Sequence, residues 1–223
     1  MPSERATVVD AYDRYYLRPD YFGYRDWLYR PYIKALAKRA GLKPGFKVLD
    51  AGCGQGFFTG VFADLGLVAI GVDVSAEGIR AAHRQYASTG ARYIVGDVRN
   101  MGLRSEFDCV FTRSCSLYNR DALDELTEVS DELLSYVKDG GVFIFDYYTR
   151  LGSRRKSASW IYHSVRAVRR HFSHYPKSEV FFSVRADSLI LGSLTFSRPV
   201  SLMSAVVSRW CGIGGELVAI VRK

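Results

Sequence analysis

The sequence has few cysteines, and none of them is paired at the spacing of a metal site or a disulfide framework. The four residues are far apart along the chain and have no histidine nearby at ligand spacing: Cys53, Cys109, Cys115 and Cys211. Zinc sites and small disulfide-rich domains place their cysteines in recognisable sets. The sequence therefore gives no support for a metal site or for disulfides, and we expect a reducing, cytoplasmic setting.

Long apolar runs are also missing. The N-terminal segment MPSERATVVDAYDRYY is charged and aromatic, whereas a secretory signal needs an apolar run of about seven residues or more. The most apolar later stretch, residues 189–207, is interrupted by serines, an arginine and a proline, so it falls short of the roughly 18 apolar residues of a membrane span. We expect no export signal and no membrane span, although a helix lying on a membrane surface stays open.

Acidic residues are absent from one long segment. Residues 147–178 contain eight Lys and Arg and no Asp or Glu. The whole chain of 223 residues has 31 Lys and Arg against 23 Asp and Glu, a net charge of +8, so this segment carries the entire excess. Charge localised in this way indicates a basic face, or an arm over a binding site, on an otherwise neutral body.

The remaining composition is that of one globular protein. Hydrophobic residues make up 48 % of the chain and charged residues 24 %, which excludes a disordered or fibrous protein. Residues 1–46 are a candidate helical cap rich in aromatics, and residues 47–223 are the main candidate domain. Aromatics with a polar group suit core edges and ligand lids. Those of the cap are Tyr12, Tyr15, Tyr16, Tyr21, Phe22, Tyr24, Trp27, Tyr29 and Tyr32.

From Lys47 onward, short runs rich in β-branched and aromatic residues alternate with helical patterns, which is typical of a parallel sheet built from βα units. We expect an α/β fold: a Rossmann-like, doubly wound, seven-stranded and mostly parallel sheet with flanking helices and the N-terminal helical cap. The predicted strands are 47–51, 68–73, 92–97, 107–112, 141–148, 179–186 and 216–223. The predicted helices are 26–41, 57–65, 76–88, 121–137, 164–172 and one from Pro199 to Trp210.

The last of these helices carries an apolar stripe, which consists of Leu202, Met203, Val206, Val207 and Trp210. A stripe of this kind faces the core in most globular proteins, so we expect it to pack over the sheet. Contact with a lipid or with a second subunit is the alternative.

A glycine-rich turn follows the first predicted strand, in the sequence Val48-Leu49-Asp50-Ala51-Gly52-Cys53-Gly54-Gln55-Gly56. Its glycines let the backbone pass close to a ligand, and its main-chain NH groups precede a helix N-terminus, so the turn indicates a nucleotide-like cofactor. The dinucleotide fingerprint would place its third glycine at position 57, where this chain has Phe. A P-loop is excluded, because no Lys followed by Ser or Thr comes after the glycines.

Acidic residues follow the next two strands. Asp73 ends the second strand, where a carboxylate is placed to accept both hydroxyls of a ribose. Asp97 ends the third, where its carboxylate can accept an adenine amino group while Val98 covers a ring face. Open α/β sheets bind ligands at the carboxyl ends of their strands. The sequence therefore predicts one cofactor site across three strand ends.

Together these motifs resemble the class I S-adenosylmethionine-dependent methyltransferases, over about residues 47–148. VLDAGCGQG resembles the first motif of the family, GVDVS the ribose-binding motif, GDV the adenine-binding motif, and LLSYVKDGGVFIF the helix, turn and fifth strand. The resemblance implies S-adenosylmethionine as cofactor and S-adenosylhomocysteine as product. The implied cofactor-binding residues are Asp50, Ala51, Gly52 and Gly54 at the methionine end, Asp73 and Val74 at the ribose, Asp97 and Val98 at the adenine, and Arg113 and Ser114 beside the sulfonium and carboxylate.

The residues around the acceptor depart from several family patterns. The segment after the fourth strand, TRSCSLYN, lacks the Asn/Asp-Pro-Pro-aromatic sequence of members that act on exocyclic nitrogens, so DNA base methylation is not expected. His163 and Tyr118 are the candidate catalytic residues, with His163 as a general base. The candidate substrate-binding residues follow the ends of strands four and five: Tyr118, Asn119, Tyr147 and Tyr148.

We expect methyl transfer to a small-molecule acceptor with an acidic or aromatic part, by in-line displacement at the sulfonium, in a monomer or homodimer. The aromatic cap and the basic segment, which flank the predicted site, favour this acceptor class. An RNA or ribosome-associated methyltransferase that uses residues 147–178 on phosphates is the alternative. A noncatalytic cofactor-binding module is a third hypothesis, which the intact motif residues do not favour.

Overall fold

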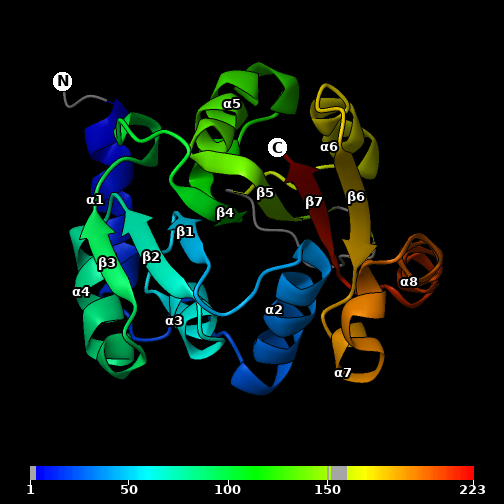
Figure 1. Cartoon of the computed structure of the whole chain (residues 1–223), viewed down its shortest axis with the longest axis horizontal. Coiled ribbons are helices and arrows are strands. Elements are labelled where there is room, and N and C mark those ends of the chain that lie inside the picture. Colours follow the sequence, from blue (N-terminus) through cyan, green and yellow to red (C-terminus); the bar gives the residue numbers. More distant parts are fainter. Residues whose placement is uncertain (1–3, 150, 152–159) are drawn as a thin grey trace.

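A seven-stranded sheet forms the centre of the molecule (Figure 1). The computed structural model describes residues 4–149, 151 and 160–223, with side chains from residue 9 onward. The strand order is β3-β2-β1-β4-β5-β7-β6. The strands are β1 Lys47–Ala51, β2 Val68–Asp73, β3 Arg92–Val95, β4 Phe107–Arg113, β5 Val137–Tyr148, β6 Ser178–Ser183 and β7 Glu216–Arg222.

The first five strands pair in parallel, and β7 pairs antiparallel with both β5 and β6. This confirms the expected Rossmann-like, mostly parallel sheet of seven strands. The strand order reverses between β1 and β4, so the carboxyl ends of these two strands flank the switch point at which open α/β sheets bind ligands. Because β7 is antiparallel, its N-terminal end lies at this same edge.

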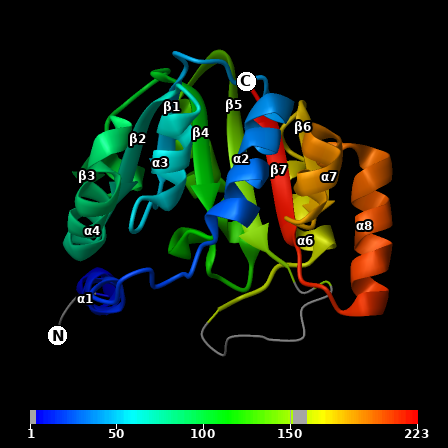
Figure 2. The ribbon, with the colours of Figure 1, turned by 90° about the horizontal axis from the view of Figure 1, so that it is seen from below.

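Helices cover both faces of the sheet (Figures 1 and 2). Successive strand residues point to opposite faces. Val48 and Ile144 pack toward α2 and α3 on one face, whereas Leu49 and Phe143 pack toward α5 and α6 on the other. The α-helices are α1 Glu4–Tyr16, α2 Asp26–Ala40, α3 Phe57–Asp64, α4 Ala76–Tyr86, α5 Thr127–Ser135, α6 Val165–Phe172, α7 Asp187–Leu191 and α8 Arg198–Cys211. The short 3-10 turns are η1 Ala87–Thr89, η2 Val98–Asn100, η3 Ser116–Tyr118, η4 Leu123–Leu126 and η5 Gly192–Phe196.

Strand β5 begins at Val137 instead of the predicted position 141, and the predicted helix 121–137 is divided into η4 and the shorter α5. Phe107 pairs with Val137 and Cys109 with Val142, so β5 carries extra residues at this point of the ladder. Gly141 fits only without a side chain, because a Cβ there would lie 2.8 Å from the carbonyl oxygen of Asp108. The pairing of Val137 with Phe107 of β4 therefore ends the helix before the chain reaches Gly140 and Gly141.

The orientation of α8 contradicts the expectation that its apolar stripe packs over the sheet. Ser201, Ser204 and Ser208 face inward and are buried, whereas all five residues of the stripe are exposed. The helix lies along β6, the edge strand of the sheet, and Ser201 Oγ accepts a hydrogen bond from the Phe182 amide at 2.8 Å. An edge strand leaves backbone groups without a neighbour, so a helix with serines on its inner side suits it better than an apolar one.

The two helices of the predicted cap contact different parts of the molecule. Helix α2 contributes Tyr32, Ile33 and Leu36 to the core beside the sheet. Helix α1 lies against α4, where Asp13 Oδ1 accepts hydrogen bonds from Ser75 Oγ at 2.5 Å and from the Glu77 amide at 3.1 Å. The division of the chain into residues 1–46 and 47–223 stays a prediction.

Replacing Gly56 with Ala tests the packing behind the glycine turn. Gly56 has a φ of +83°, and a Cβ there would lie 2.6 Å from the Ala82 Cβ and 2.7 Å from the Tyr93 ring. Gly90 has a φ of +77° with nothing within 4 Å of its Cβ, so Gly90→Ala carries only backbone strain of about 1–2 kcal/mol. We expect Gly56→Ala to cost about 1–3 kcal/mol more, because it overpacks the site. Urea unfolding measures both, and equal losses would contradict the close contact.

Candidate active site

The turn after β1 allows close approach of a ligand to the backbone. Gly52, Gly54 and Gly56 have φ values of +82°, +53° and +83°, a region that side chains disfavour. The amides of Gly52 and Cys53 both donate to the carbonyl oxygen of Val72, at 2.8 and 3.1 Å, which fixes the turn to the end of β2. Helix α3 begins directly afterwards, so the turn lies at a helix N-terminus, where negative charge is stabilised.

The Asp73 carboxylate joins the end of β2 to this turn. It is buried, and it accepts hydrogen bonds from the Gly54 amide at 2.8 Å and from the Ser75 amide at 2.9 Å. Burial raises the pKa of Asp73, and the two amide hydrogen bonds oppose that rise. The half-buried Val74 follows it. The ribose-binding role of both residues stays a prediction, but Asp73 stands beside the turn, as that role requires.

Asp50 and Ala51 end β1 and are both buried. Thr59 Oγ1, on α3, donates a hydrogen bond to Asp50 Oδ2 at 2.6 Å. Burial raises the pKa of Asp50 to about 7, although the Thr59 hydroxyl opposes this rise. Asp50 therefore holds the first turn of α3, which follows the glycine turn, against the end of β1. Its contact with the methionine end of a cofactor stays a prediction.

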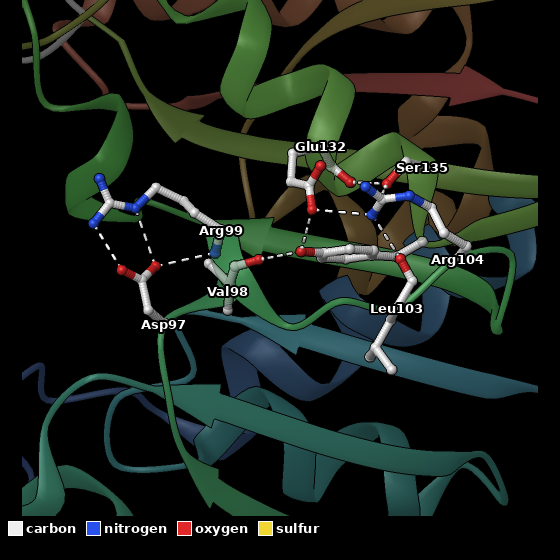
Figure 3. Close-up of polar contacts among 8 residues, drawn as sticks. Asp97, Val98, Arg99, Leu103, Arg104, Glu132 and Ser135 are labelled. Atoms are coloured by element: carbon white, nitrogen blue, oxygen red, sulfur yellow. Dashed lines mark hydrogen bonds and ion pairs between the residues drawn. The ribbon is translucent and has the colours of Figure 1, made fainter.

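Asp97 and Val98 follow β3, at the third strand end (Figure 3). The Asp97 carboxylate accepts a hydrogen bond from the amide of Arg99 at 3.0 Å, and the Arg99 guanidinium donates to both of its oxygens, at 3.0 and 2.8 Å. Val98 is buried. The position predicted for an adenine thus combines an apolar side chain with a carboxylate whose charge an arginine already balances.

A polar network holds this third strand end against α5. The hydroxyl of Tyr136 lies 2.8 Å from the carbonyl oxygen of Val98 and 2.8 Å from Glu132 Oε1. Glu132 in turn pairs with Arg104 at 3.1 Å (Figure 3). The η2 turn is therefore fixed from two sides, by Arg99 and by the helix that precedes β5.

The loop after β4 contacts the glycine turn. Ser114 has a φ of +45°, which is strained for a residue other than glycine, and its amide donates to the carbonyl oxygen of Asp146 at 2.8 Å. The next residue, Cys115, lies so close that a Cβ on Gly52 would be 2.8 Å from its Sγ. The Ser114 Oγ is buried and has no hydrogen-bond partner among the described residues. A strained backbone thus brings an unsatisfied hydroxyl beside the turn, which favours a polar ligand group there.

Aromatic side chains of the N-terminal segment lie over the glycine turn. A Cβ on Gly54 would be 2.9 Å from the Tyr16 hydroxyl, and one on Gly78 would be 2.8 Å from the Tyr16 ring. Tyr12 packs against Tyr16 with ring centroids 5.7 Å apart, and burial raises the pKa of Tyr12 to about 12. The cavity beside Gln55 is only about 20 Å³, which holds about one water molecule. In this conformation the N-terminal segment closes the turn.

Arg113 is the last residue of β4, and its side chain is almost completely buried on the face covered by α2 and α3. The guanidinium pairs with Glu216, and its Nε lies 3.4 Å from Asp146 Oδ2. Its predicted role beside the sulfonium stays a prediction, and the structure gives the guanidinium other partners. Four aromatic rings have centroids 5.0–5.3 Å from its Cζ: Tyr24, Tyr29, Phe58 and Tyr148.

A second arginine completes what we call the arginine cluster, which consists of Arg113, Asp146, Arg185 and Glu216. Arg185 Nη1 donates to Glu216 Oε1 at 2.5 Å, and its Cζ lies 4.8 Å from the centroid of the Tyr29 ring. The side chains of Arg113, Asp146 and Glu216 are buried, whereas 26 % of the Arg185 side chain is exposed. Arg185 is therefore the end of the cluster that a ligand can contact.

The pKa values of the two carboxyls in the arginine cluster shift in opposite directions. Burial raises the pKa of Asp146 to about 8, and the neighbouring Glu216 carboxylate adds to this rise, against the opposing effect of Arg113. Burial acts in the same direction on Glu216, but the guanidiniums of Arg113 and Arg185 hold its pKa below its usual range. The arginine cluster therefore favours the ionised form of Glu216 and disfavours that of Asp146.

The candidate catalytic residues Tyr118 and His163 are both buried and hold each other in place. His163 Nε2 lies 2.8 Å from the Tyr118 carbonyl oxygen, to which it donates. The Tyr118 hydroxyl lies 3.0 Å from Ser130 Oγ, and Asn119 Oδ1 accepts a hydrogen bond from the Ile161 amide at 2.7 Å. These contacts join the loop after β4 to the segment before α6. Catalysis and substrate binding by these residues stay predictions, and their contacts give them a positioning role.

The two tyrosines that end β5 point to opposite faces of the sheet. Tyr147 is buried, and its ring centroid lies 5.5 Å from that of Phe145 and 4.8 Å from that of His163. Tyr148 is half-buried on the other face and lies over Arg113. Of the four candidate substrate-binding residues, Tyr148 is the one that borders the arginine cluster.

The described part of the basic segment 147–178 includes the outer face of α6. The helix begins at the predicted cap, where Ser164 Oγ accepts a hydrogen bond from the Ala167 amide at 3.1 Å. Its arginines at 166, 169 and 170 are exposed, and the last of these pairs with Asp124 at 2.5 Å. The remaining arginines and lysine toward the start of the segment lie outside the described residues: Arg150, Arg154, Arg155 and Lys156.

Comparison with known proteins agrees with the geometry of the strand ends. Residues 48–141 match the family model described as "Methyltransferase domain". Over this stretch the chain is similar to the methyltransferase domains of class I S-adenosylmethionine-dependent enzymes. The matched stretch contains the glycine turn and the acidic residues that follow β2 and β3, so it covers the motifs on which the sequence resemblance rests.

Curated relatives are similar over part of their length. A malonyl-[acyl-carrier protein] O-methyltransferase from Enterobacter lignolyticus is 30 % identical over 145 residues, which are 65 % of this chain and 54 % of the relative. A ubiquinone biosynthesis O-methyltransferase from Nitrobacter winogradskyi is 31 % identical over 103 residues, which are 44 % of this chain and 37 % of the relative. The chain thus spans about half the length of these relatives, or less.

Solved structures share the fold at low sequence identity. A methyltransferase from Haloferax volcanii, solved with the Trm112 methyltransferase activator, is 20 % identical with a TM-score of 0.66, over 94 % of this chain and 96 % of that one. Phosphoethanolamine N-methyltransferase 2 from Haemonchus contortus, solved with S-adenosyl-L-methionine, is 17 % identical with a TM-score of 0.63, over 95 % and 60 %. At these identities the similarity shows the fold alone.

The substitution Asp50→Asn tests the buried carboxyl behind the turn. A folded-state pKa of about 7, against about 3.9 in the unfolded chain, means that the folded protein keeps a proton that the unfolded chain has lost. The free energy of unfolding therefore falls as the pH rises from about 4 to about 7. Because Asn does not titrate, we expect a smaller fall in the variant. Urea unfolding across this window measures it, with the exposed Asp139→Asn as control, and parallel curves for wild type and Asp50→Asn would contradict the assignment.

Proposed function

We propose that the protein transfers a methyl group from S-adenosylmethionine to a small-molecule acceptor that carries an acidic group. The observation behind this proposal is the convergence of three strand ends at one edge of the sheet. The glycine turn follows β1, the buried Asp73 carboxylate ends β2, and Asp97 with Val98 follows β3. This arrangement suits the cofactor. The glycine turn lets the backbone pass close to a ligand, the carboxylate can accept the ribose hydroxyls, and the apolar side chain can cover the adenine ring.

The residues around the turn fit the cofactor chemically. Asp73 would hold the ribose, and the buried Ser114 hydroxyl, which lacks a protein partner among the described residues, would satisfy a polar group of the methionine end. When bound, the cofactor supplies a methyl group already activated by the sulfonium. The chain supplies alignment and the exclusion of water. Tyr12 and Tyr16 are placed to exclude water, and in this proposal α1 moves aside to admit the cofactor.

The nucleophile is proposed to be ionised before it reaches the site. The candidate base His163 donates to a backbone carbonyl within the core, and the candidate Tyr118 directs its hydroxyl to Ser130. A carboxylate or another group that is anionic at neutral pH needs no general base. The hydrogen bonds of these two side chains therefore favour an acidic acceptor over a neutral hydroxyl or amine.

Arg185 is proposed to bind the acidic group. A guanidinium has five N–H donors in a planar fork that matches a carboxylate, and Arg185 directs one nitrogen to Glu216. The guanidinium of Arg185 stays charged at neutral pH, which adds attraction for an anion. An ammonium acceptor is disfavoured, because the rings that would bind its charge already enclose Arg113. The malonyl group in the name of one relative carries a carboxylate, which supports the same acceptor class.

The proposed setting is the reducing cytoplasm. Cys53, Cys109 and Cys115 are free thiols, and the four cysteines of the chain lack the spacing of a disulfide framework. Such chains are typical of compartments in which disulfides are rare.

Incubation with methyl-labelled S-adenosylmethionine tests the proposed function. Small-molecule and RNA fractions of a cell extract serve as separate acceptor pools. We expect label in an acidic, low-mass compound, and mild base should release that label as methanol if a carboxylate has become a methyl ester. Label confined to RNA, or no transfer to any pool despite cofactor binding, would contradict the proposal.

The substitution Asp73→Asn tests the cofactor end of the site. Hydrogen bonds to a charged group contribute about 1.5–3 kcal/mol, so we expect cofactor affinity to fall by about ten- to a hundredfold. Calorimetric titration with S-adenosylhomocysteine measures the affinity. The exposed Asp139→Asn should leave it unchanged, and an unchanged Kd in Asp73→Asn would remove this residue from the site.

The substitution Arg185→Met tests the acceptor end. For the acceptor found by labelling, we expect KM to rise about ten- to a hundredfold through loss of charged hydrogen bonds, with the Kd of the cofactor unchanged. Arg39→Met is the matched control, because Arg39 also pairs with a glutamate, Glu179 at 2.6 Å, and lies 5.3 Å from an aromatic ring, that of Phe181. Equal effects of the two substitutions on KM would rule out recognition by Arg185.

A further inference from the structure

An apolar surface that none of the described residues covers lies on α8. We call it the outer face, and it consists of Leu202, Met203, Val206, Val207 and Trp210. Leu202 is 69 % exposed and Trp210 84 %, and Ile190 of the neighbouring α7 is 88 % exposed. Figure 2 shows α8 along the outer margin of the molecule, beyond β6. Exposed apolar residues are ordinary when scattered, but a group of them on one helix face marks a binding surface.

The inner side of α8 fixes the direction of this face. Ser201 Oγ accepts the hydrogen bond of the Phe182 amide on the edge strand, and Ser204 Oγ donates to Asp187 Oδ2 at 2.6 Å. Ser208 is buried beside them. A rotation that buried the outer face would break both hydrogen bonds and leave the buried amide of Phe182 unsatisfied, which is unfavourable. The outer face is therefore held toward the solvent by the fold.

The charge beside the outer face has one sign. Residues 188–215 contain two arginines, Arg198 and Arg209, and no Asp or Glu. Both arginines are exposed. Arg198 lies one helical turn before Leu202 and Arg209 lies next to Trp210, so they border the outer face at its two ends. Two copies packed through this face in an antiparallel pair would bring arginine against arginine, whereas an anionic surface would attract both.

We propose that the outer face of α8 binds the surface of anionic phospholipid membranes. Its apolar side chains enter the boundary between headgroups and acyl chains, and Arg198 and Arg209 contact lipid phosphates. Trp210 suits this boundary, because its ring is apolar and carries one N–H donor. In the part of the chain that the structure describes, no helix is long and apolar enough to cross a membrane, so the contact is peripheral. This inference does not depend on the proposed methyl transfer.

Vesicle flotation of the full chain tests the proposal. We expect the wild-type protein to float with vesicles of phosphatidylcholine mixed with phosphatidylglycerol, and far less with pure phosphatidylcholine. The double substitution Leu202→Glu with Val206→Glu should reduce partitioning about tenfold or more, because two apolar side chains no longer leave water on binding. Arg198→Gln with Arg209→Gln should reduce it on the anionic vesicles and change little on the neutral ones. Tryptophan emission should shift to shorter wavelength on binding.

Trp27→Ser is the matched control, because Trp27 is also an exposed tryptophan, at 66 %, but lies on α2. It should float like the wild type and keep the emission shift, whereas Trp210→Ser should lose the shift. Circular dichroism and urea midpoints close to the wild type confirm that the variants are folded. Absence of flotation at low salt, or equal flotation of the double glutamate variant, would overturn the proposal. So would a wild-type dimer in light scattering that this variant converts to a monomer, because the occupant would then be a second copy.

Discussion

Burial of the Arg113 guanidinium constrains the carboxyl edge of the sheet more than any other single feature. A buried charge is costly unless it is paired, and breaking such a pair costs about 3–5 kcal/mol. The Glu216 carboxylate is the main partner of the guanidinium. It reaches Arg113 only because β7 runs antiparallel and begins where β4 ends. Asp146 supplies the second from β5, and aromatic rings complete the enclosure. The direction of β7 and the charge balance of the site are therefore linked.

The edge has two halves with different chemistry. Over β1 to β3, backbone amides and the Asp73 carboxylate form the candidate cofactor site, and the Asp97 carboxylate is balanced by Arg99. From β4 to β7 charged side chains dominate, and that of Arg185 is partly exposed among them. A nucleoside cofactor suits the first half, because hydroxyls and rings need shape and hydrogen bonds more than charge. An acidic acceptor suits the second, and the loop at Ser114 connects the two.

The sequence predicted what local spacing determines. The strands, the glycine turn and the position of Asp73 depend on residues close together in the chain, and the turn and the acidic residue meet through Gly54 as the motif requires. The partners of Arg113 could not be predicted, because Asp146 and Glu216 stand far along the chain and reach it only through the order of the strands. The position of Tyr16 over the turn had one weak signal, the crowding of aromatics in the first 32 residues.

The orientation of α8 was wrongly predicted for a related reason. Hydrophobic periodicity identified the helix and its apolar stripe, but the stripe faces outward because serines on the other side satisfy the edge of β6. The contact of the Tyr118 hydroxyl with Ser130 could not be predicted either, because Ser130 lies on another element, and the ligand role of Tyr118 stays a prediction. Periodicity and motif position give no information about which neighbour a side chain meets across the fold.

The most direct test of the two-part site is a map of amide chemical shifts during titration with S-adenosylhomocysteine. The account predicts saturable changes at residues 52–56, 73–75 and 97–98, with smaller ones in α1 as Tyr16 moves. Changes confined to the arginine cluster, or no saturable change at the three strand ends, would contradict it.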